Sequence, residues 1–249
     1  MATNVDLWGI LSDLKKCKWV DLTHAFGPDT PRFPAFDPAK NEVIYSIEEH
    51  GFLANKFTFP GQYGTHMDAP GHFTKGGRML HEIELKEMVL PLVVIDCSEE
   101  AKKDNNYELT VQDIFDWESE YGTVPEGSFV AMRTDWCKRW PSQEKCMDLD
   151  SDGNQQGPGW SLEALKFLYE VRKINANGHE PFDTDSQAMA IKNKGLIAEG
   201  YVLGQDKLQI EVMTNLDQVP PTGAIIFCIV PKPLNASGFP VRAFAIVNN

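Results

Sequence analysis

Long apolar runs are missing from this sequence. No segment approaches the roughly 20 apolar residues that cross a bilayer, and the N-terminus lacks the basic and apolar regions of a secretory signal. The five cysteines, at positions 17, 97, 137, 146 and 228, form no CxxC pair and no disulfide pattern. We therefore expect a cytoplasmic protein whose thiols are reduced.

Positive charge is also scarce. The 249 residues include 23 Lys and Arg against 36 Asp and Glu, which gives a formal net charge of −13 at pH 7. Nucleic acids and anionic membrane surfaces bind basic patches, so we expect neither as a partner. We expect a small-molecule substrate, and a homodimer because closed two-fold dimers are common among soluble enzymes.

Several catalytic and nucleotide-binding motifs are absent. The chain has no GxGxxG, no P-loop and no GxSxG nucleophile elbow. Apolar segments typical of strands are interleaved with few helical patterns, which predicts a single α/β domain with a mixed sheet or barrel-like core. The expected strands are 18–22, 43–47, 53–59, 89–96, 128–133, 174–178, 209–213, 224–230 and 241–247, and the expected helices are 4–16, 110–118 and 161–172.

The N-terminal segment has its own pattern. Leu7, Ile10, Leu11 and Leu14 have helical spacing, and Asn4 is a candidate N-cap. We interpret residues 1–17 as a helical arm and residues 18–249 as the main domain. The apolar face of the arm must pack either on its own domain or on a partner subunit.

The stretch GQYGTHMDAPGHF, residues 61–73, carries the candidate chemistry. Side chains two residues apart share one face of an extended segment, so Gln62, His66 and Asp68 are expected to form one chelating face. His72 follows Pro70, where the chain should turn, and can approach that face from outside. Small residues between them allow close approach of the backbone to a ligand. This set favours a metal site over a polar strand end.

The donor types of this face suggest an ion and a reaction. An imidazole, a carboxylate and an amide oxygen suit Mn²⁺, with Zn²⁺ as the alternative, and no thiolates of a structural zinc site accompany them. A divalent ion lowers the pKa of bound water from ~15.7 towards ~7. His72 is the candidate proton carrier because it titrates near neutrality. Glu211, on a late strand, is the candidate carboxylate that orients this histidine.

An irregular, proline-rich loop follows the strand that ends near His24. It contains Phe26, Phe33 and Phe36, which must be buried somewhere. They either form the wall of an apolar pocket or anchor the loop on the core. With Phe59, they suggest a flat or aromatic ligand, although each of these side chains also suits a core.

The motif GTHMDAPGHF, residues 64–73, resembles the HxGTHxDxPxHF signature of the cyclase family of metal-dependent hydrolases, which includes kynurenine formamidases and isatin hydrolases. DLTH at 21–24, the pattern beginning NLD at 215 and PVRA at 240–243 resemble further family motifs. The resemblance implies a swivelling β/β/α fold, a Mn²⁺ or Zn²⁺ centre and hydrolysis of an amide. It implies His66 and Asp68 as metal ligands, His72 as a catalytic residue or second-metal ligand, and a substrate pocket near His24 and the phenylalanine-rich loop.

The chain departs from the signature at Gln62, which stands where the signature has histidine. An amide oxygen is a weaker zinc donor than imidazole, and this favours Mn²⁺. In the 179–205 region, where a two-zinc formamidase would supply a histidine, His179 is the only histidine and comes at the start. We therefore expect one metal and a cyclic amide of the isatin type. The alternatives are an arylformamidase acting on N-formylkynurenine-type substrates, hydrolysis of a lactone or ester, and a catalytically inactive ligand-binding relative.

Overall fold

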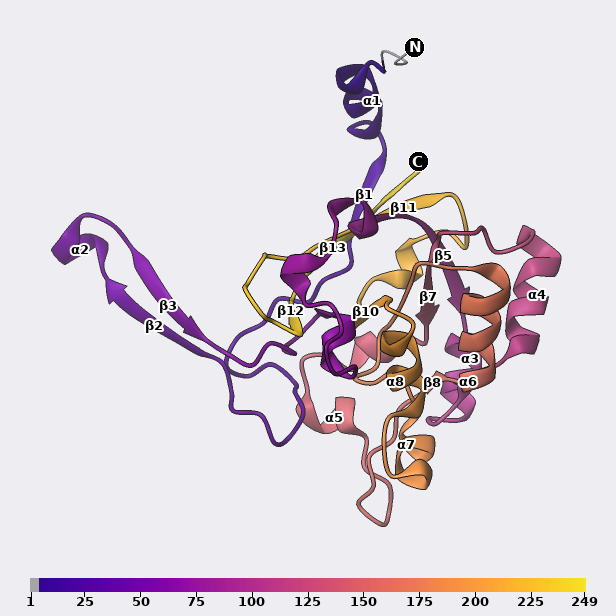
Figure 1. Ribbon diagram of the computed structural model, residues 1–249. Helices are drawn as coiled ribbons and strands as arrows, with labels where there is room; N and C mark the ends of the chain where they lie inside the picture. The colour runs from indigo at the N-terminus through magenta and orange to yellow at the C-terminus, as the bar shows by residue number, and fades with distance from the viewer. Residues whose placement is uncertain (1–4) are drawn as a thin grey trace.

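One curled sheet forms the centre of the fold. The computed structural model describes residues 5–249, and in that part of the chain nine strands join in the order β1-β13-β11-β5-β7-β9-β10-β4-β12 (Figure 1). Their bounds are β1 Lys18–Asp21, β4 His66–Asp68, β5 Val89–Asp96, β7 Phe129–Arg133, β9 Ala176–His179, β10 Leu208–Glu211, β11 Ala224–Ile229, β12 Gly238–Pro240 and β13 Arg242–Val247. Strands β5, β7, β9 and β10 run parallel and the other pairings are antiparallel. The sheet is therefore mixed, as the sequence predicts.

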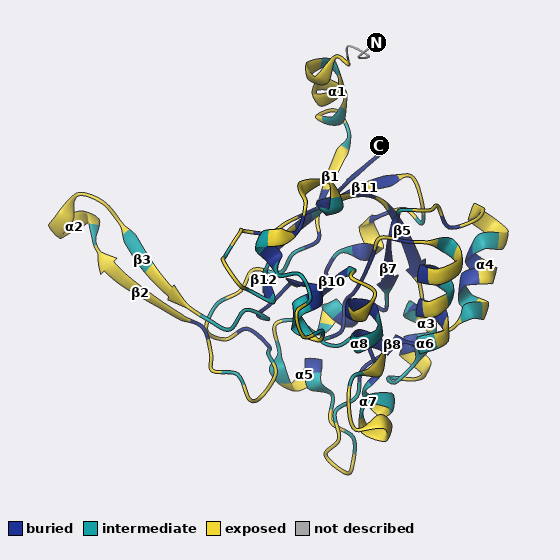
Figure 2. Cartoon of the chain, viewed as in Figure 1, coloured by how far each residue is buried: buried dark blue, intermediate teal, exposed yellow. Residues whose placement is uncertain are grey.

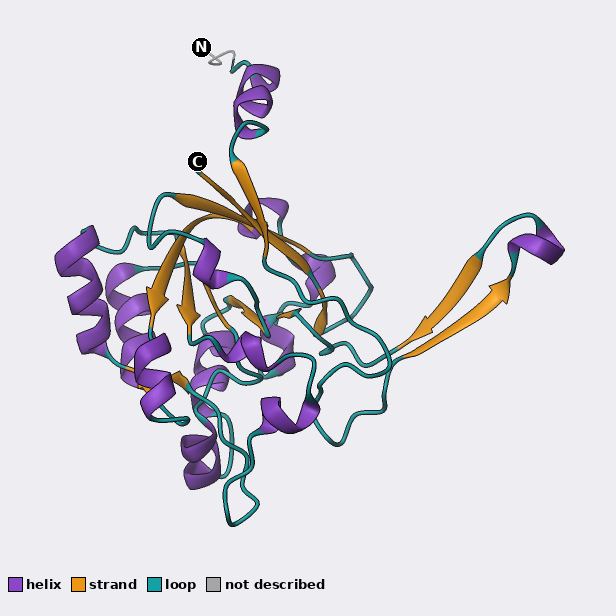
Figure 3. Cartoon of the chain, turned by 180° about the vertical axis from the view of Figure 1, so that it is seen from behind, coloured by secondary structure: helices purple, strands orange, loops and turns teal. Residues whose placement is uncertain are grey.

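Helices α4 Val111–Tyr121, α6 Leu162–Lys166 and α8 Ile197–Gly204 pack on one face of this sheet; Figure 3 shows the helices and the strands from behind. The other helices of the body are α3 Ser98–Lys103, α5 Gln143–Met147 and α7 Gln187–Asn193. A π-helix, Phe167–Arg172, continues α6, and short 3-10 helices include Pro70–His72. A two-residue pair, β6 Glu108–Leu109 and β8 Gly159–Trp160, lies outside the main sheet.

The two faces of the sheet bury two hydrophobic clusters, because successive residues of a strand point to opposite sides. On β5, Val93 and Ile95 pack with Ile114 of α4 and with other residues of the helical layer. Leu92 and Val94 belong to the other cluster, which includes residues from β1, β11 and β13. This two-sided burial explains why β5 reads as a nearly continuous apolar segment.

Most of the helices and strands expected from the sequence are present, and some differ in their bounds. The prediction of 89–96 matches β5, whereas the expected strand through residue 62 is reduced to His66–Asp68 because Gly64 has φ +62°. The expected N-terminal helix is α1, Leu7–Leu14, and its N-cap is Asp6; Asn4 lies outside the described residues. Residues 184–204, which have no clear pattern, form α7 and α8.

Two segments extend from the body. Strands β2 (Lys40–Tyr45) and β3 (Ala54–Thr58), joined through α2 (Ile47–His50), form a hairpin arm that is exposed except for part of β3, which is half-buried (Figure 2). Helix α1 also extends from the body, and none of its residues is buried against the described part of the chain. Within residues 5–249 no helix combines the length and apolar character needed to cross a membrane.

Candidate metal centre and active-site cavity

Strand β4 places His66 and Asp68 between two strands from the end of the chain. Its register opposite β10 sets His66 beside Glu211 and Asp68 beside Gln209. On its other side, β12 sets Gly238 opposite Asp68. A Cβ atom on Gly238 would collide with the Gln62 amide nitrogen and with Asp68 Oδ1. The glycine therefore allows the backbone of β12 to approach the site closely.

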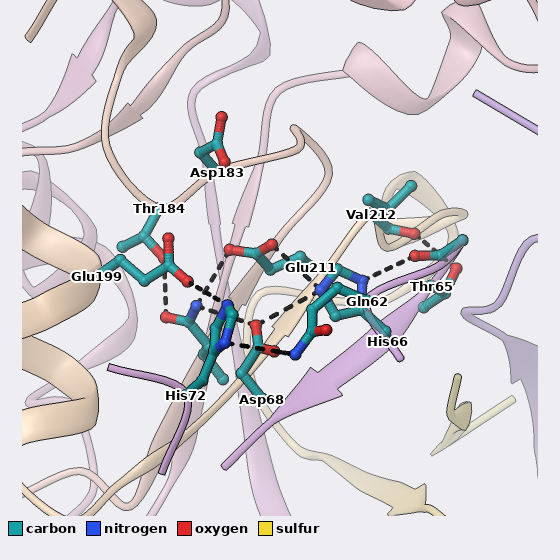
Figure 4. A network of polar contacts seen from close by, with 12 residues as sticks. Gln62, Thr65, His66, Asp68, His72, Asp183, Thr184, Glu199, Glu211 and Val212 are labelled. Carbon is teal, nitrogen blue, oxygen red and sulfur yellow. Dashed lines mark hydrogen bonds and ion pairs between the residues drawn. The ribbon is translucent and has the colours of Figure 1, made fainter. Parts of the chain in front are cut away.

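His66 is held between two carboxylates (Figure 4). Its Nε2 atom lies 3.5 Å from Asp68 Oδ2 and 3.4 Å from Glu211 Oε2. Nδ1 lies 2.9 Å from the Gly64 carbonyl oxygen, which can only accept, so Nδ1 carries the proton. In neutral His66, the Nε2 lone pair then points towards both carboxylates, and Nε2 has no hydrogen-bond partner among residues 5–249.

The charges around His66 require a cation. Burial alone would lower the pKa of His66, but the carboxylates of Asp68 and Glu211 outweigh it and raise this pKa well above its usual value. A proton on Nε2 satisfies this requirement, and so does a metal ion. One ligand atom from each of His66, Asp68 and Glu211 lies within 4.8 Å of the others. These donors fit a divalent cation, because an imidazole and two carboxylates are ordinary metal ligands.

Gln62 lies against the other side of the Asp68 carboxylate. Its amide nitrogen donates to Asp68 Oδ1 at 3.2 Å and lies 3.5 Å from His72 Nδ1 and 3.4 Å from Ser237 Oγ. Gln62 thus reaches the candidate centre from a loop, and its amide nitrogen, not its oxygen, faces Asp68. Gln209, which the sequence reading missed, donates to Asp68 Oδ2 at 3.4 Å and to Glu211 Oε1 at 3.0 Å.

Glu199 is the carboxylate beside His72, with 3.8 Å between Glu199 Oε1 and His72 Nε2. Asp68, His72 and Glu199 form a second group that could hold a metal ion. Glu199 lies in the first turn of α8, an element that no clear sequence pattern predicts. Burial, followed by the charges of Glu211 and Asp68, raises the pKa of Glu199 well above its usual value.

Glu211 does not orient His72, contrary to the sequence-based hypothesis. Its Oε1 lies 3.4 Å from Nε2 of the buried His179, and its Oε2 faces His66. The reason is topological: β10 lies between β4 and β9, which carry His66 and His179. The next residue, Val212, has φ +57°, a conformation rare for a β-branched side chain. Thr65 Oγ1 donates to the Val212 carbonyl oxygen at 2.6 Å and holds this turn.

A cavity of about 290 Å³ opens on these groups. Phe33 and Phe36 line it, together with Phe73 and Phe182, which the sequence reading did not assign to a pocket. Asp183 also lines it, and burial, with the nearby Glu211 charge, raises the pKa of Asp183 to about 7. The remaining lining residues include His66, His72, Glu199 and Glu211.

Three residues expected at the pocket lie outside its lining. Phe26 packs edge-on against Phe59, with 5.2 Å between ring centroids, and against Gly64. His24 stacks on Trp140 at 4.2 Å, and burial lowers the pKa of His24 to about 4. None of the three is among the described residues that line the cavity. Phe33 and Phe36 therefore form part of the cavity wall. The expectation that all three phenylalanines of the loop are buried is wrong, because Phe33 is 60% and Phe26 39% exposed.

Comparisons with known proteins agree with this architecture. Residues 20–186 match the model of the putative cyclase family. The isatin hydrolase of Roseibium aggregatum is 31% identical over 242 residues, covering 92% of this chain and 91% of that protein. The kynurenine formamidase of Bacillus anthracis is 34% identical over 86 residues, 34% of this chain and 41% of that protein.

Solved structures give the same relation. Isatin hydrolase A from Labrenzia aggregata, bound to benzyl benzoate, superposes with a TM-score of 0.91 at 33% identity, covering 98% of this chain and all of that chain. An isatin hydrolase bound to the product analogue thioisatinate gives a TM-score of 0.91 at 27% identity, with both chains covered completely. The resemblance inferred from the motifs therefore extends over the whole fold.

Proposed function

The chain belongs to the cyclase family, and from this premise we propose that it is a metal-dependent hydrolase that opens a cyclic amide of the isatin type. The observation that carries the proposal is His66 Nε2, buried between two carboxylates without a hydrogen-bond partner in residues 5–249. The similarity to isatin hydrolases over nearly the whole chain supports this substrate class. An aryl formamide is the alternative substrate, given the shorter match to a kynurenine formamidase.

His66, Asp68 and Glu211 would hold the ion. Two carboxylates and one imidazole form a hard donor set, which favours Mn²⁺ over Zn²⁺. Gln62 was the third ligand suggested by the sequence; in our proposal Glu211 takes this place, and Gln62 holds Asp68 through Oδ1. A divalent ion at this position supplies Lewis-acid chemistry, since it polarises a carbonyl and lowers the pKa of water.

The protein groups around the cavity supply the remaining requirements. His72 would take a proton from the attacking water and return it to the amide nitrogen as the C–N bond breaks. Glu199, with Oε1 3.8 Å from His72 Nε2, would orient His72. The aromatic side chains of Phe33, Phe36, Phe73 and Phe182 would hold a flat ring. The products are a carboxylate and an aromatic amine on one molecule.

Metal analysis combined with an amide panel tests this function. Metal-free protein should hydrolyse isatin only after Mn²⁺ is added. His72→Ala should bind Mn²⁺ as wild type does and lose about 10²- to 10⁴-fold in kcat, the usual contribution of a general acid or base. His50→Ala, on the hairpin arm, is the matched control and should be unchanged. Full activity in protein free of metal would refute the mechanism.

The same panel separates the alternatives. Formanilides, lactones and aryl esters should be poorer substrates than isatin if the cyclic amide is correct. A protein that takes up no Mn²⁺ in a calorimetric titration and hydrolyses none of these compounds would instead be an inactive ligand-binding relative.

A further inference from the structure

Arg32 stands out among the residues that line the cavity. Three carboxylates, of Asp183, Glu199 and Glu211, contribute to the lining, and Arg32 is its single Lys or Arg side chain within the described part of the chain. No carboxylate of residues 5–249 forms an ion pair with Arg32. In a chain with 36 acidic and 23 basic residues, an arginine that lines a cavity and has no carboxylate partner is available to a ligand.

The position of Arg32 is fixed by its backbone. The Arg32 amide donates to Gln143 Oε1 at 2.8 Å, and Gln143 Nε2 donates to the Arg32 carbonyl oxygen at 2.8 Å. Gln143 is the first residue of α5, so this pair of bonds fastens the loop of Phe33 and Phe36 to a helix. A residue held in this way is preorganised to contact a ligand at little entropic cost.

The Arg32 side chain retains donors for a ligand. Nε donates to the Phe36 carbonyl oxygen at 3.1 Å, and Nη1 donates to the Thr30 carbonyl oxygen at 3.4 Å. A guanidinium has five N–H groups, so three remain, including both on Nη2. Planar N–H groups of this kind match the two oxygens of a carboxylate.

We propose that Arg32 binds an anionic group on the substrate, so that the preferred substrates are aromatic amides that also carry a carboxylate on the ring. This inference rests on the proposed function and narrows its substrate class. Arg32 is the single Lys or Arg among the described residues that line the cavity, and its remaining N–H groups offer a substrate anion one place to bind. A substrate with one acidic substituent is oriented by this contact.

Binding of two non-hydrolysable ligands tests the proposal. Indole and indole-5-carboxylate have similar rings and no amide bond, and both can be titrated calorimetrically into Mn²⁺-loaded protein. The acid should bind wild type about 10- to 100-fold more tightly, the range expected for a hydrogen bond to a charged group. In Arg32→Met this difference should disappear while the affinity for indole is unchanged. Lys103→Met, which removes a positive charge from exposed α3, should behave as wild type.

Three results would overturn the proposal. These are the absence of a preference for the acid in wild type, a preference retained in Arg32→Met, and an equal loss of affinity for both ligands in Arg32→Met. The last result would mean that Arg32 only braces its loop through Thr30 and Phe36. Gln143→Ala is the comparison for such a structural role, because it removes the two bonds that hold the Arg32 backbone and keeps the guanidinium. Its affinities for the two ligands show what release of the loop alone does.

Hydrolysis separates this inference from the proposed function. Mn²⁺-loaded wild type should hydrolyse isatin, and should show a higher kcat/KM for isatin carrying a carboxylate on its benzene ring. Failure to hydrolyse either compound would refute the proposed function, while the binding comparison would still decide whether Arg32 recognises an anion.

Discussion

Asp68 links the two groups of polar residues at the site. Its Oδ2 faces His66 and accepts from Gln209, whereas its Oδ1 accepts from Gln62 on the side of His72. A change at this residue therefore affects the candidate ligands and the proton carrier together. Glu211 contacts only the His66 side and Gln62 only the His72 side of this carboxylate. Variants at these two residues can therefore separate metal binding from proton transfer.

Metal affinity should distinguish ligands from supporting residues. We expect Asp68→Asn and Glu211→Gln to weaken Mn²⁺ binding by more than about 100-fold, because each removes a charged donor. Gln62→Ala should weaken it by about 10-fold, within the range for a residue that orients a ligand. Calorimetric titration of metal-free variants measures both effects, with Glu49→Gln on the arm as control. A Gln62→Ala loss equal to that of Asp68→Asn would make Gln62 a ligand.

Glu180 should make the stability of the protein depend on pH. The buried carboxyl accepts from the Thr134 amide at 3.0 Å, and burial raises its pKa from 4.5 to about 7. The folded state therefore keeps a proton that the unfolded chain releases above pH ~4.5. The stabilising effect is complete below that pH and is lost as pH rises through 7.

For Glu180, the expected decline in free energy of unfolding between pH 5 and pH 8 is at most about 3 kcal/mol, from the 1.36 kcal/mol per unit of pKa. Glu180→Gln mimics the protonated carboxyl and should remove this part of the decline. Urea unfolding at pH 5, 6, 7 and 8 measures it for both proteins. Equal slopes in the two proteins would show that another group is responsible.

The residues found from sequence alone are those close together in the chain. His66, Asp68 and His72 lie within seven residues, and Gln62 is near enough to be included by its spacing. Glu199 and Gln209 approach them only through the placement of α8 and the register between β10 and β4. No local pattern encodes such a register, so these two residues could not be assigned before the fold was known.

At the level of elements, α8 depends on a residue outside it. Its N-cap residue, Leu196, offers no capping side chain. Asp185 replaces it: Oδ1 accepts from the amides of Ile197 and Ala198, both at 2.9 Å, and Oδ2 accepts from that of Glu199 at 3.0 Å. Asp185 thus satisfies the free N–H groups of the first turn and positions the Glu199 carboxylate.

Asp185→Ala should therefore destabilise the protein by about 3 kcal/mol, since hydrogen bonds to a charged group contribute roughly 1.5–3 kcal/mol each and water replaces part of the loss. Asp185→Asn keeps one acceptor oxygen and should cost less. Lys103→Ala, which breaks the exposed ion pair with Glu100, is the control and should cost under about 1 kcal/mol. Urea unfolding measures all three, and equal effects of the Asp185 and Lys103 changes would contradict this role.

Burial decides which elements could be predicted from the sequence. Strand β5 is buried on both faces, so its apolar sequence identifies it with the observed bounds. Strand β12, of three residues, contains Gly238 and Pro240 and has no apolar alternation. It forms because β4 offers an unpaired edge. The β12 strand is therefore determined by its contact with β4 and not by its own sequence pattern.

At the scale of the whole molecule, α1 and the hairpin arm expose apolar side chains away from the body. Trp8 is 87% exposed, and Phe52 and Phe57 of the arm are 53% and 59% exposed. We expect these segments to contact a second copy of the chain, in agreement with the homodimer suggested by the sequence. Burial of one such side chain contributes roughly 1.5–3 kcal/mol.

Ultracentrifugation should therefore give twice the 28.0 kDa of one chain. Replacing residues 42–56 by an Asn-Gly turn shortens the arm and keeps the hairpin closed. This variant should dissociate at micromolar concentrations at which wild type is dimeric. An unchanged mass for the variant would exclude the arm as the contact. Ultracentrifugation of a chain without residues 1–17 tests in the same way whether the helical arm contributes to the dimer contact.

The position of β12 has a consequence for the order of folding. Strand β4 pairs with β10 and β12, which both lie far from it along the chain. Until these strands have docked, His66 and Asp68 lack Glu211 and the backbone of Gly238. Tight binding of the ion should therefore report that these distant segments have folded together.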